Sequence, residues 1–241
     1  MAFKIFMLLT NRRIIMKIIM FVSIFLLILT LSSWTFDENF DSGKAKDWVV
    51  VTGTWEVDNG EYHQAVPDGV NLFSFYAVGD ESWKDYTFEV KVKPVQTPYA
   101  GVVFRVMETG PGGAAPGWSQ GQFISWLLGT AGGKGYSKIW KAMLGPEAML
   151  EGTDGDILKL NSWSNIKVVV NGNNVQCYLE GKLQKEFKDA QDSILTGGIG
   201  LMTYGDTLYD NVVVTGPGIP GAAVDSTGKL TTTWGDLKTS R

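Results

Sequence analysis

The sequence has only one cysteine and one histidine among its 241 residues. A single cysteine excludes a disulfide framework, and a single histidine excludes a zinc site built from histidines. Cys177 lies in the apolar run from Val175 to Leu179, so we expect a buried and unreactive thiol. Stability must therefore come from one sizeable hydrophobic core.

Basic residues are scarce beyond position 33. The first 33 residues hold four of them (Lys4, Arg12, Arg13 and Lys17) and no acidic residue, so the remainder has 17 basic and 25 acidic side chains and a net charge of −8. Nucleic-acid recognition requires a basic face. We therefore expect no nucleic-acid partner.

The leading segment has the layout of a secretory signal, with basic residues followed by an uncharged run and then Ser32 and Ser33. The apolar run from Ile18 to Leu31 is shorter than the roughly 20 residues of a membrane-spanning helix. We predict that residues 1–33 direct the protein to a secreted, periplasmic or cell-surface location. The alternative is an uncleaved anchor, which would then be the protein's contact with the membrane.

Helical periodicity is absent, whereas alternating strand patterns recur. Tyr86 to Lys93 alternates strictly, which places Phe88, Val90 and Val92 on a core face. The same alternation from Ala100 to Val106 predicts that Arg105 points away from the core. Trp163 to Phe187 reads as a three-strand meander with turns at Asn171-Gly172 and Glu180-Gly181.

The chain begins and ends its strand-rich part with matching segments, Phe36 to Phe40 and Leu208 to Val214. Pairing them in one sheet would cover two bare edges. Two glycine-rich segments, 109–121 and 145–159, are predicted loops. A Pro/Gly linker follows Gly216, so we expect a domain over 34–216 and a linker and polar tail over 217–241.

Several motifs in order resemble the concanavalin A-like lectin/glucanase superfamily, and within it the laminin G-like and keto-disaccharide hydrolase-like bacterial domains. The motifs are Trp48 with Gly53-x-Trp55-x-Val57-x-x-Gly60-x-Tyr62, Trp83 to Val90, Ala100 to Arg105, Trp163-x-x-Ile166-Lys167-Val168, and Tyr209 to Val214. The resemblance covers about residues 36–215. It implies an all-β jelly-roll sandwich of two antiparallel sheets, with a concave groove that holds glycans in many members.

The resemblance also implies a structural calcium ion, held by an acid of the closing strand and groups near the first strand. The matching positions are Asp210, Asp37 and Glu38, with a backbone carbonyl from Gly60. Calcium takes carboxylate and carbonyl oxygens, which agrees with this set. The alternative is that Asp210 only accepts hydrogen bonds from backbone amides and fixes the last strand.

Candidate carbohydrate-binding residues combine a guanidinium with aromatic rings. Sugars stack their C–H faces on aromatic rings, and a guanidinium can bind their hydroxyls in a bidentate manner. The candidates are Arg105, Trp118, Trp126, Tyr136 and Trp140. The other motif tryptophans, Trp48, Trp55, Trp83 and Trp163, are assigned to core packing.

Catalytic motifs are missing. Glycosidases of this superfamily carry Glu-x-Asp-x-x-Glu, and the nearest string, Glu151 to Asp156, has other spacing and reads as a turn. His63 lacks a Gly-x-Ser-x-Gly partner motif, so a structural role is expected. The leading hypothesis is an exported, calcium-stabilised domain that binds carbohydrate without cleaving it. The alternatives are a keto-disaccharide-type glycoside hydrolase, with Arg105 as substrate clamp, and a laminin G-like protein-interaction module.

Overall fold

The computed structural model describes residues 35–65, 72–76, 82–97, 99–108, 121–131, 134–143, 147–154, 157–189 and 194–219. Every regular element in these ranges is a β-strand. In the described part of the chain, no helix has the length and hydropathy that crossing a membrane requires.

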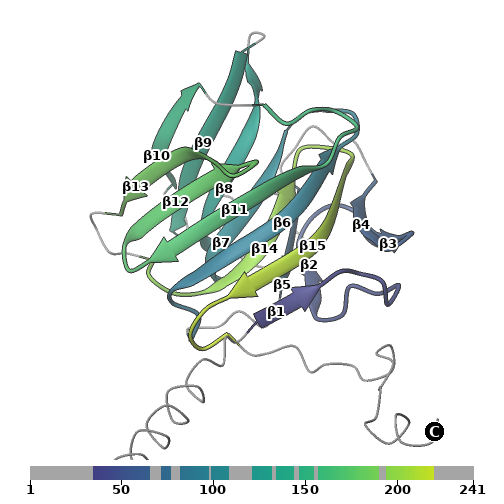
Figure 1. The fold of residues 1–241 in the computed structure, drawn as a ribbon, viewed down its shortest axis with the longest axis horizontal. Helices are drawn as coiled ribbons and strands as arrows, with labels where there is room; N and C mark the ends of the chain where they lie inside the picture. Colours follow the sequence, from purple (N-terminus) through teal and green to yellow (C-terminus); the bar gives the residue numbers. More distant parts are fainter. Residues whose placement is uncertain are drawn as a thin grey trace, which may run out of the picture. The chain divides into compact units, whose positions relative to one another are not determined.

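The strands form two antiparallel sheets that lie face to face (Figure 1). The eight-stranded sheet has the order β13 (Lys182–Lys188), β12 (Asn174–Leu179), β11 (Ser164–Asn171), β6 (Tyr86–Pro94), β15 (Thr207–Thr215), β4 (Glu61–Gln64) and β3 (Trp55–Asp58), with β1 (Thr35–Glu38) also paired to β15. The seven-stranded sheet has the order β10 (Glu147–Asp154), β9 (Lys134–Met143), β8 (Gln122–Ala131), β7 (Ala100–Glu108), β14 (Gly198–Thr203), β5 (Leu72–Tyr76) and β2 (Trp48–Val50). The expected all-β jelly-roll sandwich is confirmed.

The two matching end segments pair as predicted. β1 runs antiparallel to the end of β15, with Thr35 opposite Thr215 and Glu38 opposite Val212. Phe36 of β1 and Val212 and Val214 of β15 are all buried in the main core. The first and last strands therefore protect each other's edges.

The core between the sheets follows the predicted alternation. Phe88, Val90 and Val92 of β6 are buried, whereas Glu89 and Lys91 are exposed. β11, β12 and β13 form the expected meander, and Gly172 and Gly181 take positive φ angles in its two turns. Cys177 is fully buried on β12, where burial raises the pKa of its thiol, in agreement with the expected unreactive cysteine.

Two sequence-based boundaries need correction. Most of the predicted loop 145–159 is strand β10, which pairs with β9 and has a register shift between Met149 and Glu151. The other predicted loop, 109–121, lies outside the described residues apart from Gly121. Ile219, assigned to the linker, is fully buried in the main core, so the packed chain continues past Gly216.

Candidate functional site

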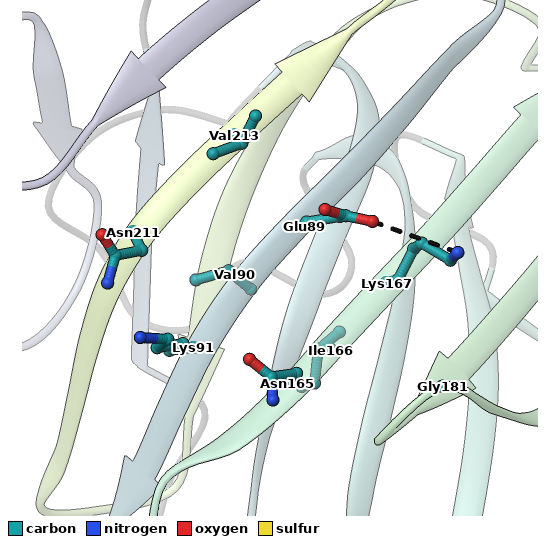
Figure 2. Close-up of a pocket in the computed structure, with 9 residues that line it drawn as sticks. All are labelled: Glu89, Val90, Lys91, Asn165, Ile166, Lys167, Gly181, Asn211 and Val213. Atoms are coloured by element: carbon teal, nitrogen blue, oxygen red, sulfur yellow. Dashed lines mark ion pairs between the residues drawn. The ribbon is translucent and has the colours of Figure 1, made fainter.

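A hollow of about 320 Å3 opens on the outer face of the eight-stranded sheet, over β6, β11 and β15 (Figure 2). Alternation within the strands brings its polar side chains to one face, because their neighbours in sequence point into the core. The described lining residues are Glu89, Val90, Lys91, Asn165, Ile166, Lys167, Gly181, Asn211 and Val213. The volume lies at the small end of the range of ligand sites in proteins.

The polar groups of the hollow include both donors and an acceptor. The ammonium groups of Lys91 and Lys167 donate, and the carboxylate of Glu89 accepts at 4.0 Å from Lys167 Nζ (Figure 2). Among the described residues, no carboxylate oxygen lies within ion-pair distance of Lys91 Nζ. A hydroxyl-rich ligand could therefore both accept from and donate to this surface.

A β-bulge in β15 brings Asn211 to the hollow. Asp210 pairs with Lys91 and Val213 with Glu89, so β15 has one residue more than β6 between these pairs. Asn211 takes a positive φ of 52° at this point. Asp210 holds it, because Asp210 Oδ1 accepts from Asn211 N at 2.6 Å and Oδ2 accepts from Asn211 Nδ2 at 2.8 Å. Bulges commonly redirect a side chain in this way.

The predicted outward position of Arg105 is wrong. Arg105 is 0% exposed, and its φ of 52° places it in the left-handed region. Both partner strands lose register here, between Phe104 and Glu108 on the β8 side and between Phe104 and Val106 on the β14 side. A bulge thus breaks the alternation on which the prediction rested.

Arg105 connects parts of the sandwich through its hydrogen bonds. Its Nη1 donates to the carbonyl of Ile194 at 3.0 Å, and its Nη2 donates to the carbonyl of Gly172 in the β11–β12 turn. Its backbone N–H donates to Tyr86 Oη at 2.8 Å. Burial lowers the pKa of the guanidinium, while Tyr86, Asp85 and Asp189 act in the opposite direction. The side chain is a structural cation.

The two predicted tryptophans on β8 and β9 do not share a face. Trp126 is fully buried between the sheets and donates from Nε1 to Ser137 Oγ at 2.6 Å, so its assignment to an open groove is also wrong. Trp140 pairs with Ser125 on the opposite face of the sheet and is half-buried. Tyr136 lies on β9, but its side chain is outside the described part of the structure, as is all of Trp118.

The outer face of the seven-stranded sheet carries a second apolar cluster. It comprises Val103, Val106, Phe123, Leu127, Ala142 and Met202, and Val51 and Tyr204 pack against it. All six members are buried. Because these six side chains are buried, the part of this face that they occupy is not the open groove that the sequence predicted.

The predicted calcium ligands lie near one another but do not all suit one ion. Asp37 and Glu38 are consecutive in β1, and consecutive strand residues point to opposite faces. Asp210 accepts a hydrogen bond from the backbone N–H of Asn211, which is the kind of contact that the alternative to a calcium ligand predicts. No group of three or more His, Cys, Asp or Glu side chains with metal-binding geometry occurs among the residues that the structure describes.

Asp41 is an acidic neighbour that the sequence patterns did not indicate. Burial raises the pKa of both Glu38 and Asp210, and the charge of Asp41 adds to each shift. A Cβ at Gly60 would lie 3.2 Å from Asp41 Oδ1, so the β3–β4 turn contacts the same acid. A bound cation would relieve the repulsion that Asp41 exerts on Glu38 and on Asp210.

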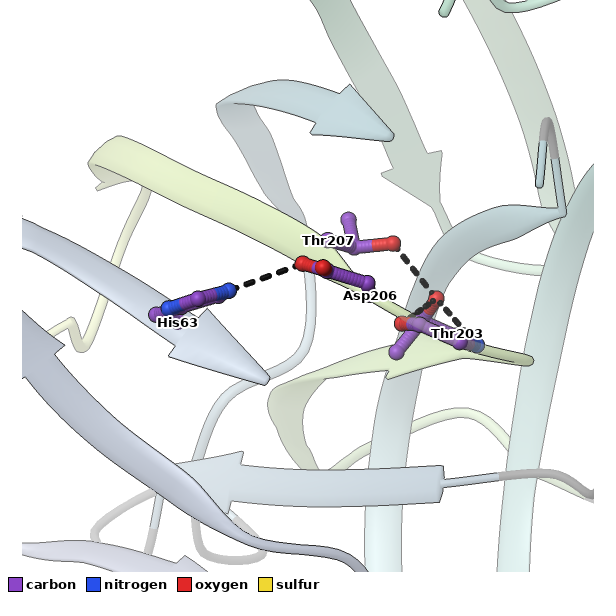
Figure 3. A network of polar contacts seen from close by, with 5 residues as sticks. His63, Thr203, Asp206 and Thr207 are labelled. Carbon is purple, nitrogen blue, oxygen red and sulfur yellow. Dashed lines mark hydrogen bonds and ion pairs between the residues drawn. The ribbon is translucent and has the colours of Figure 1, made fainter. Parts of the chain in front are cut away.

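His63 has a partner after all. Its Nε2 lies 2.8 Å from Asp206 Oδ1, and both side chains are largely buried (Figure 3). Next to them, the hydroxyls of Thr203 and Thr207 are 2.7 Å apart (Figure 3). Gly205 N donates to Thr203 Oγ1. These contacts fix the β14–β15 turn against β4. A histidine oriented by a carboxylate is also the arrangement of many general bases.

The hollow itself was not predicted from the sequence, although part of its signal was present. Alternation placed Lys91 and Glu89 on the wet face of β6. The pairing of β6 with both β11 and β15 is what assembles the hollow, and this is a matter of topology. Trp163, assigned to the core, is 36% exposed and lies beside this surface.

The fold and the closing strand pair define a concanavalin A-like jelly-roll sandwich. Residues 30–215 match the family model described as the 3-keto-alpha-glucoside-1,2-lyase-like domain. The chain therefore belongs to this family. None of the curated proteins compared with the chain matches it.

Solved structures show the same fold at low sequence identity. The carbohydrate-binding module CBM66 from Bacillus subtilis is 17% identical, with a TM-score of 0.54 over 70% of this chain and 96% of that one. A Bacillus subtilis protein of unknown function with a galectin-like fold is 16% identical, with a TM-score of 0.59 over 75% and 94%. The carbohydrate recognition domain of Emp47p is 9% identical, with a TM-score of 0.58 over 76% and 94%. At these identities the likeness concerns the fold alone.

Proposed function

We propose that the protein is an exported jelly-roll domain that binds carbohydrate in the hollow of the eight-stranded sheet and does not cleave it. The observation that carries this proposal is the hollow's combination of ammonium donors with a carboxylate acceptor. Neighbouring sugar hydroxyls can accept from Lys91 and donate to Glu89. Glu89 is the sole carboxylate among the described lining residues, whereas glycoside hydrolysis usually needs two that face each other.

Removing polar groups from the hollow should weaken sugar binding without unfolding the domain. We expect Lys91→Met and Asn211→Gly each to raise the Kd for a glycan-array ligand about tenfold, equivalent to about 1.4 kcal/mol. Glycine suits the positive φ of Asn211, so this change adds no backbone strain. The measurement is calorimetric titration, with melting temperature as the folding control.

Lys188→Met is the matched control, because Lys188 is an exposed lysine on edge strand β13 of the same sheet. Its Kd should equal that of the wild type. Equal affinity in all variants would disprove the hollow as the site. Absence of glycan binding together with capture of a protein ligand would favour the laminin G-like alternative.

A structural calcium ion is the second part of the proposal, with Glu38 and Asp210 as ligands from the predicted set and Asp41 and the Gly60 carbonyl as further ligands. The supporting observation is that burial raises the pKa of both Glu38 and Asp210 and that the charge of Asp41 adds to each shift. We expect a chelator to lower the melting temperature and calcium to restore it, since an ion at 100 times its Kd stabilises by about 2.7 kcal/mol. Asp210→Asn should remove the chelator effect while keeping an acceptor for Asn211 N. A melting curve unchanged by chelator would rule the ion out.

Lyase or hydrolase activity on a 3-keto-glucoside is the second candidate function, favoured by the His63–Asp206 pair. If Nε2 donates its proton to Asp206, Nδ1 carries the lone pair of a general base. Under this alternative, product release from a 3-keto-glucoside should fall at least 100-fold in His63→Ala. Under our proposal, wild type and variant release no product, as measured by chromatography of the sugar. Product release by the wild type would establish an enzyme.

A further inference from the structure

Trp163 extends the hollow along the strand direction. It directly precedes β11 and is two residues before Asn165, which lines the hollow, so the alternation of the strand puts both on the outer face. Two residues of strand span about 7 Å, so the ring lies next to the hollow along the strand. On β6, Lys93 lies two residues beyond Lys91 and on the same face. Its Nζ lies 4.6 Å from the centre of the Trp163 ring.

The Trp163 ring is more exposed than the core tryptophans. Trp163 is 36% exposed, whereas Trp83 and Trp126 are fully buried in the core between the sheets. Among the described tryptophans, it is the one that counts as an exposed large apolar side chain. Exposed aromatic rings beside a hollow are suited to stacking against the C–H face of a ligand.

The charges on this face are mixed. Lys93 pairs with Glu61 at 3.4 Å, and Lys167 with Glu89 at 4.0 Å. Asp210 lies opposite Lys91 in the sheet register, and Lys91 lowers the pKa of Asp210 against the raising effect of its burial. A surface with this near balance favours an uncharged, hydroxyl-rich ligand over a polyanion.

We propose that the hollow and Trp163 form two consecutive subsites for a neutral oligosaccharide chain that lies along β6 and β11. This inference rests on the proposed function, because it assigns a length and a charge class to the ligand of the same site. One unit occupies the hollow, and the next stacks on the Trp163 ring. The side chain of Lys93 shifts from the ring face when the chain binds.

The test uses the full-length protein and two oligosaccharide ladders, glucose to maltohexaose and glucose to cellohexaose, with oligogalacturonate as the acidic probe. We expect the Kd to fall about tenfold between the monosaccharide and the disaccharide of the better ladder. Trp163→Ala should remove this gain and leave the monosaccharide Kd unchanged. Leu183→Ala, which removes a comparably exposed apolar side chain from β13, should leave both values unchanged.

The outcomes separate this inference from the proposed function. If the Kd does not change with oligosaccharide length but rises in Lys91→Met, the two-subsite inference is overturned. The hollow then remains a site for a single sugar unit. Preference for oligogalacturonate would overturn the neutral ligand class. Absence of binding to every probe would overturn both the inference and the function on which it rests.

Discussion

Lys141→Met should lower the free energy of unfolding by about 3–5 kcal/mol, one of the two largest effects that we expect. Lys141 Nζ lies 3.0 Å from Asp189 Oδ1, and the two side chains are 3% and 2% exposed. Lys141 lies on β9 of one sheet, and Asp189 directly follows β13 of the other. Without the ammonium, the carboxylate of Asp189 stays buried beside a side chain that cannot neutralise it.

This effect is measurable by urea unfolding, and the melting temperature should fall by roughly 10 °C. The double variant Lys141→Met with Asp189→Asn should recover at least half of the loss, because it removes the buried carboxylate together with the ammonium that faces it. Lys134→Met changes an exposed lysine of the same strand and should have little effect. A loss below 1 kcal/mol for the single variant would show that the pair does not hold the sheets together.

Arg105→Ala should cost about 3–4 kcal/mol of stability, because it leaves the carbonyls of Ile194 and Gly172 without a donor and opens a cavity. Arg105→Gly should be about 1 kcal/mol more stable than Arg105→Ala, since only glycine takes a φ of 52° without strain. We therefore expect the free energy of unfolding to decrease from the wild type to Arg105→Gly and then to Arg105→Ala. This order is specific to a residue with a positive φ at the bulge.

Sugar binding distinguishes this structural role from a ligand clamp. Below the melting temperature of each Arg105 variant, we expect the Kd at the hollow to match that of the wild type. A variant that stays folded and loses binding would restore the sequence-based interpretation, in which Arg105 contacts the substrate. Arg105→Ala with wild-type stability would contradict the buried contacts described above.

The β-bulge in β7 explains why pattern-based prediction failed at Arg105. Alternation assumes one residue per step on both strands, and the β7 bulge adds one after Phe104. Val106 then joins Val103 in the second apolar cluster instead of sharing the core face with Phe104. Gly197 accommodates the bulge, because a Cβ there would lie 2.5 Å from the carbonyl carbon of Arg105.

Prediction succeeded where the signal was local. The alternation of β6 and the glycine turns of the β11–β13 meander depend on residues that are neighbours in the chain. The pairing of β1 with β15 was also predicted, from matched composition at the two ends. Whether the leader is removed, and whether calcium binds, remain predictions that the chelator experiment and N-terminal sequencing of exported protein would test.

The sequence by itself determined the core face of β6, the β11–β13 meander, the pairing of the end strands and the jelly-roll class, because alternation, turn residues and edge pairing are encoded over short distances or at the ends of the chain. Only the tertiary structure decided which side chains meet. It placed Lys91, Asn165 and Asn211 around one hollow and buried Arg105 and Trp126. The physical reason is that neighbours across a sheet come from strands distant in sequence, and a single bulge reverses the face of every residue after it.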